Sequence, residues 1–165
     1  MSGRIIQVLV LPALLACLSC DRCGEQTPDE ELITRLVDRA VELAEKHDIG
    51  GLMDLASSDF LARPGNHDGR ETRRLLFLIF RRYRSIEILH PRPRVELDPS
   101  GERATARVVF LMLRRGQERP DLEGLGDDLD RWVERAADFA RLYRLDLDLV
   151  KIDGDWLVQQ ARLER

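Results

Sequence analysis

The sequence has few cysteines, and all three of them lie near the start of the chain. They are Cys17, Cys20 and Cys23, so the rest of the chain has no disulfide framework and must be stabilised by a hydrophobic core. Aromatic residues make up only 5% of the chain. No apolar run approaches the roughly 20 residues that a membrane-spanning helix requires. These shortages exclude a cysteine-rich secreted scaffold and give no pattern for a transmembrane helix.

The chain also lacks the short motifs that mark well-known reaction types. It contains no nucleophile elbow, phosphate loop, zinc motif or dinucleotide fingerprint, and Gly124-Leu125-Gly126 lacks the third glycine of a nucleotide site. Of the histidines, His47 suits the end of a helix, His67 lies in a polar loop without a third metal ligand, and His90 precedes a proline at a strand kink. We therefore predict no catalytic residue, no metal and no cofactor.

The balance of charge is slightly acidic. Lysine and arginine number 26 and aspartate and glutamate 30, which gives a formal net charge of −4. Nucleic-acid partners select strongly basic surfaces, so we do not expect one here. An acidic domain is equally ill suited to lie flat on anionic lipid. With 44% hydrophobic and 34% charged residues, the 165-residue chain can form one folded domain with its own core.

The first residues have the features of an export signal. A short segment with one positive charge, Arg4, precedes an apolar stretch from Ile5 to Ala16, which has the length of a signal-peptide core. The end of this stretch, Leu14-Leu15-Ala16-Cys17, resembles the lipobox of bacterial lipoproteins. The resemblance implies that the Cys17 thiol accepts diacylglycerol and that cleavage leaves Cys17 as the first residue of the mature protein.

This resemblance divides the chain into three parts and implies a cellular location. Residues 1–16 are the expected signal peptide, residues 17–26 a polar tether and residues 27–165 the exported domain. Cys20, preceded by Ser19, is the alternative lipidation site, and cleavage without lipidation is the alternative process. We expect the protein on the periplasmic side of a bacterial envelope membrane, held there by its lipid anchor.

Helical patterns occupy the first part of the exported domain. Apolar residues recur every three or four positions from residue 32 to residue 44, which predicts an amphipathic helix that ends at Gly50-Gly51. A second, short helix is expected over Leu52–Phe60, and Arg63–Gly69 has the composition of a loop. A third helix is expected over Glu71–Tyr83. The residues expected to form its buried face are Leu75, Leu76, Ile79, Phe80 and Tyr83.

The hydrophobic period then changes to that of strands. Extended segments are expected at residues 86–97, 104–114, 143–150 and 156–163. Pro91 and Pro93 interrupt the first of them, which predicts a sheet edge or a bulge. Asp153-Gly154 is a strong signal for a two-residue hairpin turn. Helices followed by strands, without alternation, predict an α+β domain with an antiparallel sheet.

Two segments of this domain resemble the NTF2-like (SnoaL-like) family. Residues 150–158, Val-Lys-Ile-Asp-Gly-Asp-Trp-Leu-Val, are similar to that family's last hairpin. Residues 45–53, Glu-Lys-His-Asp-Ile-Gly-Gly-Leu-Met, are similar to the junction between its first two helices. The resemblance covers about residues 29–165 and implies N-terminal helices packed on a curved antiparallel sheet, a cone with a pocket inside. It does not imply an activity.

The resemblance also suggests where a pocket would lie. The candidate pocket residues are Phe60, Tyr83, Tyr143 and Trp156. Asp59 falls on an element that could border the pocket, but the acid pairs, tyrosine–aspartate pairs and histidine–aspartate dyads of catalytic members cannot be matched to positions here. The segment 115–136 is an insertion relative to the plain pattern, and it either covers the cone mouth or lies elsewhere.

The third predicted helix has a basic face that includes Arg73, Arg74 and Arg81. Such a face binds an acidic partner or lipid head groups, or remains solvated. We predict a lipid-anchored, non-catalytic envelope protein that binds a small apolar ligand or another envelope protein, with a homodimer as a further possibility. Two alternatives stay open. One is an isomerase, dehydratase or hydrolase that uses the cone pocket, and the other is an assembly lipoprotein that acts through the arginine-rich helix.

Overall fold

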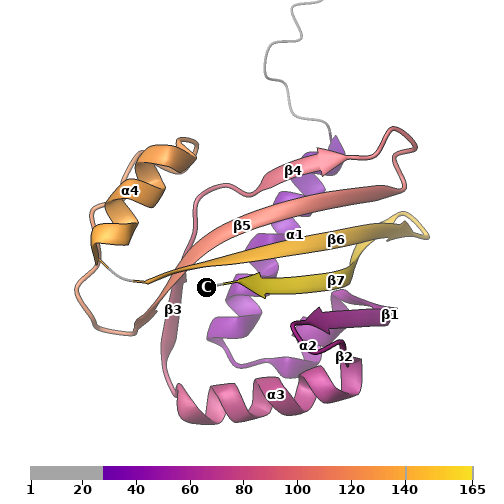
Figure 1. Ribbon diagram of the computed structural model, residues 1–165, viewed down its shortest axis with the longest axis horizontal. Helices are drawn as coiled ribbons and strands as arrows, with labels where there is room; N and C mark the ends of the chain where they lie inside the picture. Colours follow the sequence, from indigo (N-terminus) through magenta and orange to yellow (C-terminus); the bar gives the residue numbers. More distant parts are fainter. Residues whose placement is uncertain (1–27, 140, 165) are drawn as a thin grey trace, which may run out of the picture.

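The computed structural model describes residues 28–139 and 141–164. The signal peptide, the tether and both candidate lipidation sites, Cys17 and Cys20, lie outside the described residues. Within them, three helices pack on one face of a curved seven-stranded sheet, and a fourth helix lies apart from the other three (Figure 1). This is the predicted α+β architecture of N-terminal helices on a curved, mostly antiparallel sheet.

Three helices form the layer on the inner face of the sheet. Helix α1, Pro28–Glu45, buries Ile33 and Val37 at helical spacing, as its amphipathic pattern predicts. Helix α2, Ile49–Asp54, follows after a tight turn, and helix α3, Gly69–Arg82, runs along the border of the molecule below the sheet (Figure 1). In the part of the chain that the structure describes, no helix combines the length and the hydropathy needed to cross a bilayer.

Three long strands form the centre of the sheet. They are β5, Arg103–Arg114, β6, Leu142–Ile152, and β7, Asp155–Glu164, and they pair antiparallel in that order. The predicted strands in these regions are confirmed. Asp153-Gly154 forms the turn between β6 and β7, with φ values of 53° and 94°. Two positive φ values in succession are what a tight hairpin turn of this kind requires.

Shorter strands complete both edges of the sheet. On one side, β1, Ala56–Arg63, pairs parallel with β7 and antiparallel with β2, His67–Asp68. On the other side, β3, Ile86–Leu89, and β4, Arg94–Leu97, pair with opposite halves of β5. The two prolines of this region lie in the break between β3 and β4, which confirms the predicted edge interruption. The strand order is β2-β1-β7-β6-β5-β3, with β4 also paired to β5.

The predicted second helix, Leu52–Phe60, is wrong in its second half. Helix α2 ends at Asp54, and the chain continues as strand β1 from Ala56. The reason is a tertiary pairing, because Ala56 lies beside Val158 of β7 at the other end of the chain. Local periodicity contains no information about such a partner. Gly50-Gly51, expected to end the first helix, lies inside α2 instead.

Strand β5 separates two hydrophobic clusters, because successive side chains of a strand point to opposite faces. On the inner face, Ala104, Ala106 and Val108 join the main core together with Ile33 of α1 and Trp156 of β7. This core holds α1 against the sheet, and Met53 of α2 packs against it.

The second cluster lies on the opposite face of β5. Leu111 and Leu113 pack there against Trp132 of helix α4, Leu129–Phe139. Since Phe110 and Met112 alternate with these residues, the cluster and the inner face are separated by the thickness of the sheet. Of the two alternatives for the insertion at residues 115–136, the structure therefore supports the second: its helical part covers the outer face of the sheet and not the cone mouth.

Candidate functional site

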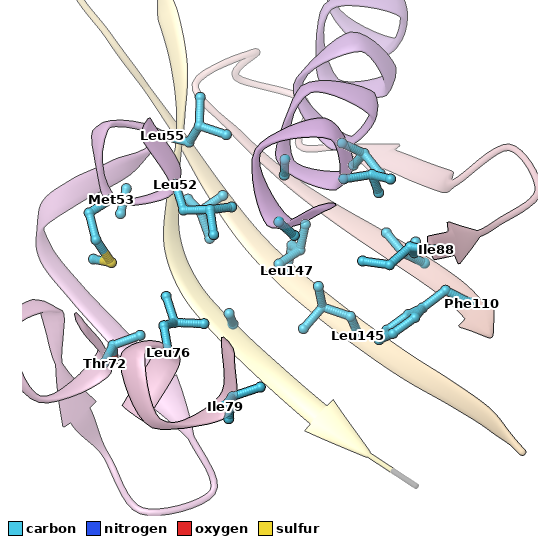
Figure 2. Close-up of a pocket in the computed structure, with 18 of the residues that line it drawn as sticks. Leu52, Met53, Leu55, Thr72, Leu76, Ile79, Ile88, Phe110, Leu145 and Leu147 are labelled. Carbon is cyan, nitrogen blue, oxygen red and sulfur yellow. The ribbon is translucent and has the colours of Figure 1, made fainter. Parts of the chain in front are cut away.

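An apolar cavity lies between the inner face of the sheet and the three N-terminal helices. Its volume is about 320 Å³, at the lower end of the range for small-molecule sites. Figure 2 shows Leu52 of α2, Leu76 of α3 and Leu147 of β6 directed into the same space from different sides. The cavity is therefore assembled from elements that are far apart in the sequence.

Hydrocarbon forms almost the whole wall of the cavity. Leucine, isoleucine, valine, alanine, methionine and phenylalanine side chains line it, and the polar side chains that join them are Thr72 and Tyr83. No carboxylate, imidazole, amine or guanidinium group lines it within residues 28–139 and 141–164. The wall thus offers dispersion contacts and burial of apolar surface, and very little hydrogen bonding.

Small side chains leave the space open. Ala40 and Ala44 of α1, Ala56 of β1 and Ala161 of β7 all line the cavity. A leucine or phenylalanine at any of these positions would extend into the space that is now empty. Their small size contributes to the open space in an otherwise bulky apolar layer, since protein interiors are generally close-packed.

Helix α3 forms the exposed wall of the cavity. Thr72, Leu76, Ile79 and Phe80 line the cavity at helical spacing, and Tyr83 follows directly after the helix. Ile79 is 45% exposed and Tyr83 is 37% exposed. Side chains that line a cavity and also reach solvent mark its mouth, which therefore lies beside the C-terminal half of α3.

The expected buried face of α3 is only partly buried. Phe80 is buried and Leu76 is half-buried, whereas Leu75, Ile79 and Tyr83 are exposed. The prediction of burial is therefore wrong for these three residues. The physical reason is that periodicity identifies the side of a helix that faces the protein, but it cannot tell a filled core from a hollow.

Reciprocal hydrogen bonds define where α3 begins. The Glu71 amide donates to Asp68 Oδ1 over 2.8 Å, and the Asp68 amide donates to Glu71 Oε2 over 3.4 Å. This capping box satisfies amide groups that have no partner within the first helical turn. It orients the start of the helix, and with it Thr72, toward the cavity.

Close packing on α1 places α2. Asp48 Oδ1 accepts a hydrogen bond from the Gly51 amide over 2.9 Å and so caps α2. A Cβ atom on Gly51 would lie 2.6 Å from Leu43 Cδ2, which is closer than two carbon atoms can approach. Glycine therefore permits this close contact without a shift of the Leu43 side chain, and the contact brings Leu52 and Met53 to the cavity wall.

A polar contact closes the other end of the helical layer. Asp29, in the first turn of α1, accepts hydrogen bonds from Lys151 Nζ over 2.6 Å and from Trp156 Nε1 over 3.0 Å. The bond from Lys151, followed by the bond from Trp156, lowers the pKa of the Asp29 carboxyl below its usual value. The Trp156 side chain thus lies in the core and is hydrogen-bonded to α1.

The structure brings two of the four predicted pocket residues together. Phe60 and Tyr83 line the cavity, whereas Tyr143 and Trp156 are not among the lining residues. Tyr143 stacks on Phe110, its partner across the sheet, with ring centroids 5.5 Å apart, so it lies beside a residue of the wall on the same face of the sheet. Trp156 is 5% exposed and belongs to the main core. Of these two side chains, Trp156 is enclosed by the core, and Tyr143 adjoins the cavity wall without lining it.

The acidic and imidazole groups near the cavity lie behind its wall or outside it. Asp59 is exposed and accepts hydrogen bonds from Ser57 over 2.7 Å and from Gln159 over 2.6 Å. These bonds, that from Ser57 first, lower the pKa of Asp59. His47 stacks on Phe80 with centroids 4.6 Å apart, behind the lining residue. Neither Asp59 nor His47 is among the residues that line the cavity.

A second, polar hollow lies between α1 and the segment that joins β3 to β4. Among its residues are Glu31, Asp38, His90, Arg92 and Asp127. Arg92 donates to Glu31 over 2.9 Å, and His90 Nε2 lies 3.6 Å from Asp38 Oδ1. These groups face one another and join α1 to the sheet edge. Among the described residues, no three His, Cys, Asp or Glu side chains are grouped so that they could hold a metal.

Most of the cavity wall was not predicted from the sequence. The alternation of Leu145 and Leu147 correctly assigns them to one face of their strand, but it does not say that this face lines a hollow. Ala40 and Ala44 fit the apolar side of a helix equally well as packing residues. Their small size on a face otherwise rich in leucine and valine is the signal that could have indicated an open space.

Comparison with protein-family models and with curated proteins finds no match for this chain. Solved structures do match. A protein of unknown function with a cystatin-like fold from Nostoc punctiforme PCC 73102 has a TM-score of 0.63 at 14% sequence identity, over 86% of this chain and 94% of that one. An NTF2-like protein of unknown function from Pseudomonas putida KT2440 has a TM-score of 0.64 at 14% identity, over 86% of this chain and 89% of that one.

A third similar structure has a provisional enzymatic name. It is a protein from Novosphingobium aromaticivorans DSM 12444 provisionally named a scytalone dehydratase, with a TM-score of 0.59 at 16% identity, over 82% of this chain and 83% of that one. At identities this low, the agreement concerns the fold alone. The chain has the NTF2-like, cystatin-like α+β fold, as the resemblance in its sequence implied.

Proposed function

We propose that this protein binds a small apolar molecule in the cavity between the helices and the sheet, and that it holds the molecule without transforming it. The observation that carries the proposal is the hydrocarbon wall around about 320 Å³ of space. Burial of apolar ligand surface favours binding by about 25 cal/mol per Å². A charged ligand group would lose its hydration in this cavity without gaining a partner. The ligand class is therefore an aliphatic chain or a hydrophobic ring system.

The same wall argues against the enzymatic alternative. General acid–base catalysis needs a titratable side chain within hydrogen-bond reach of the reacting group. Thr72 already donates to the His67 carbonyl oxygen over 3.4 Å, and Tyr83 lies at the mouth. The provisional dehydratase name belongs to a structure that is similar in fold. The experiments below therefore also test for a dehydratase, isomerase or hydrolase activity.

We also propose the cellular setting that the N-terminal sequence predicts. The chain is exported, lipidated at Cys17 and held at a bacterial envelope membrane, which suits a protein that handles hydrophobic molecules. Incorporation of radiolabelled palmitate in the native host tests this. Label should be lost from Cys17→Ala and retained by Cys20→Ala. The reverse result would assign the anchor to Cys20, and label in neither the native chain nor the variants would contradict lipidation.

The cavity itself is tested with the uncharged fluorescent probe N-phenylnaphthylamine, whose emission rises in apolar surroundings. The protein is the full chain with Leu9→Glu and Leu14→Glu, named the export-deficient chain below. The two glutamates interrupt the apolar N-terminal stretch, so that it cannot itself bind the probe. We expect saturable binding of one probe molecule per chain. Mass spectrometry of apolar molecules extracted from the native protein then identifies the natural ligand.

A filled cavity is the decisive comparison. Ala44→Leu adds side-chain volume to the cavity wall, and we expect probe affinity to fall by about tenfold with the fold retained. Ala137→Leu is the matched control, because Ala137 is exposed on α4 and does not line the cavity. Equal affinities for both variants would contradict binding in this cavity. Turnover of the extracted molecule by the purified protein would establish the enzymatic alternative instead.

A further inference from the structure

We propose that the outer face of helix α3 docks on a membrane surface that contains anionic phospholipid, and that the cavity exchanges its ligand with the lipid there. The docking surface is defined as the exposed side of α3, residues 69–82. The exchange step rests on the proposed function, whereas the docking step does not.

The docking surface exposes large apolar side chains. Phe77 is 58% exposed, Leu78 is 61% exposed and Leu75 is 39% exposed. All three lie within one turn of α3, and Leu75 precedes Ile79, which marks the mouth of the cavity, by four residues. Isolated apolar residues are common on protein surfaces, but a contiguous group points to a binding partner.

Arginines surround these apolar side chains. Arg70, Arg74, Phe77 and Arg81 are separated by four, three and four residues, which places them along one side of the helix. Arg73 and Arg82 add two further positive charges, and Glu71 is the acidic residue of α3. A helix that exposes phenylalanine and leucine among arginines has the composition of an interfacial membrane helix.

The arginines of α3 are available for an external partner. Within residues 28–139 and 141–164, none of them forms an ion pair, although Arg82 lies 5.8 Å from the Tyr83 ring. Arginines on the outer face of the sheet behave differently, because Arg107 pairs with Asp146 at 2.8 Å and Arg144 pairs with Glu164. The positive charge of the docking surface is therefore not neutralised by the described part of the chain.

Charge decides between the possible occupants of this surface. A second copy of the chain, docked through the same helix, would bring two groups of unpaired arginines together. Anionic phospholipid instead supplies negative head groups for the arginines and an acyl layer for Phe77 and Leu78. The net charge of −4 still opposes contact over a broad face, so the contact is confined to the border of the molecule where α3 lies (Figure 1).

The position of the cavity mouth suggests that docking allows ligand exchange with the lipid. Ile79 and Tyr83 lie on the same helix as the docking surface and reach both the cavity and solvent. A ligand that fits a hydrocarbon wall is poorly soluble in water. Transfer at the lipid surface would spare it a passage through bulk water, because the mouth lies on the same helix as the residues that contact the lipid.

The predicted anchor is compatible with this orientation. The start of α1 and helix α3 lie at opposite ends of the molecule in Figure 1. Helix α1 has 18 residues, which corresponds to a length of about 27 Å. The ten residues between Cys17 and Pro28 reach about 35 Å when extended. A chain lipidated at Cys17 can therefore touch the same membrane with α3.

Vesicle co-sedimentation tests the docking. The export-deficient chain is mixed with vesicles of phosphatidylcholine alone or with one third phosphatidylglycerol, at low salt and at about 0.5 M NaCl, where exposed charges are screened. We expect sedimentation with the phosphatidylglycerol vesicles at low salt only. Arg74→Glu with Arg81→Glu should lower the vesicle affinity by about tenfold or more. Phe77→Ser with Leu78→Ser should lower it while leaving the charge unchanged.

A matched control keeps the net charge of the charge-reversed variant. Arg115→Glu with Arg135→Glu reverses two exposed arginines that lie outside α3, and vesicle affinity should stay within about twofold of the parent chain. Circular dichroism confirms that each variant is folded. Equal loss in the control, equal binding to neutral vesicles, or no binding by the parent chain would each overturn the docking proposal. Self-association that the α3 variants abolish would overturn it in favour of a second copy.

Probe binding in lipid-free solution separates the two proposals. All α3 variants should bind N-phenylnaphthylamine like the parent chain if the cavity is intact, so loss of vesicle binding alone concerns the docking surface. If the parent chain binds vesicles but not the probe, the docking stands and the proposed function fails. Transfer of the probe from phosphatidylglycerol vesicles should be slower for Arg74→Glu with Arg81→Glu than for the control, and equal rates would contradict the exchange step.

Discussion

The indole nitrogen of Trp156 donates a hydrogen bond to the Asp29 carboxylate over 3.0 Å, and this bond joins the first turn of α1 to the last strand of the sheet. Lys151 donates to the same oxygen over 2.6 Å and lies 5.5 Å from the Trp156 ring. One carboxylate thus holds a helix, a hairpin strand and a core tryptophan together, at the end of the helical layer away from α3.

Replacement of Asp29 should weaken the dependence of the free energy of unfolding on pH in the acidic range. The folded pKa of Asp29 is lowered, first by Lys151 and then by Trp156, so its contribution is present above the unfolded pKa and is lost as the pH falls through the folded value. Asp29→Asn should reduce the free energy of unfolding by about 1 kcal/mol at pH 7 and by much less below the folded pKa. Urea unfolding across this pH range measures the difference. The exposed Asp155→Asn is the control, and an equal effect of both variants would contradict the assignment.

The two glycines of α2 should respond in opposite ways to a methyl group. Gly51→Ala places a Cβ atom 2.6 Å from the buried Leu43 side chain, so we expect a loss of about 1 kcal/mol in stability and weaker probe binding. Gly50→Ala meets only Asp48 Oδ1 at 3.4 Å and should gain up to about 1 kcal/mol from helix propensity. Thermal unfolding and probe titration compare them. A stabilised Gly51→Ala would show that α2 is not packed as described.

Loss of the α3 cap should loosen the mouth of the cavity. Asp68→Ala removes the acceptor of the Glu71 amide and should lower stability by about 1 kcal/mol. Because α3 forms the exposed wall, hydrogen exchange of its amides should increase and probe affinity should fall. Asp138→Ala, in the last turn of α4, serves as the control. Unchanged exchange in α3 would contradict a role of this cap in positioning the wall.

A pair of valine truncations should separate the two faces of the sheet. Val41→Ala enlarges the cavity at α1, whereas Val133→Ala removes a contact in the cluster under α4. Both should cost about 1 kcal/mol of stability. Only Val41→Ala should change the affinity or the size preference for apolar probes. A change of similar size in Val133→Ala would mean that the outer cluster is coupled to the cavity.

The parts of the fold that the sequence predicts correctly are those specified by local patterns of residues. The spacing of Ile33 and Val37, the alternation from Tyr143 to Leu149 and the Asp153-Gly154 turn each specify an element without reference to any other. The helical pattern over Leu52–Phe60 failed because its second half pairs with β7, and no local signal encodes a partner so far along the chain.

The candidate site was predicted less well, for a related reason. Phe60 and Tyr83 line the cavity, but Trp156, chosen as an aromatic candidate, is committed to Asp29 and the core. An aromatic or apolar residue has the same sequence signature whether it fills a core or lines a hollow. The difference depends on the volumes of side chains from several elements, such as Ala44 and Ala161.

The sequence by itself determined most of the elements, the α+β class, the predicted export signal and the basic character of α3, because each depends on residues that are neighbours in the chain. Only the tertiary structure decided that the helices leave a cavity, that α4 packs on the other face of the sheet, and that Phe77 and Leu78 are exposed on the same helix that forms the cavity mouth. These properties depend on packing between distant segments, and the shape of the space between them is set by all of their side chains together.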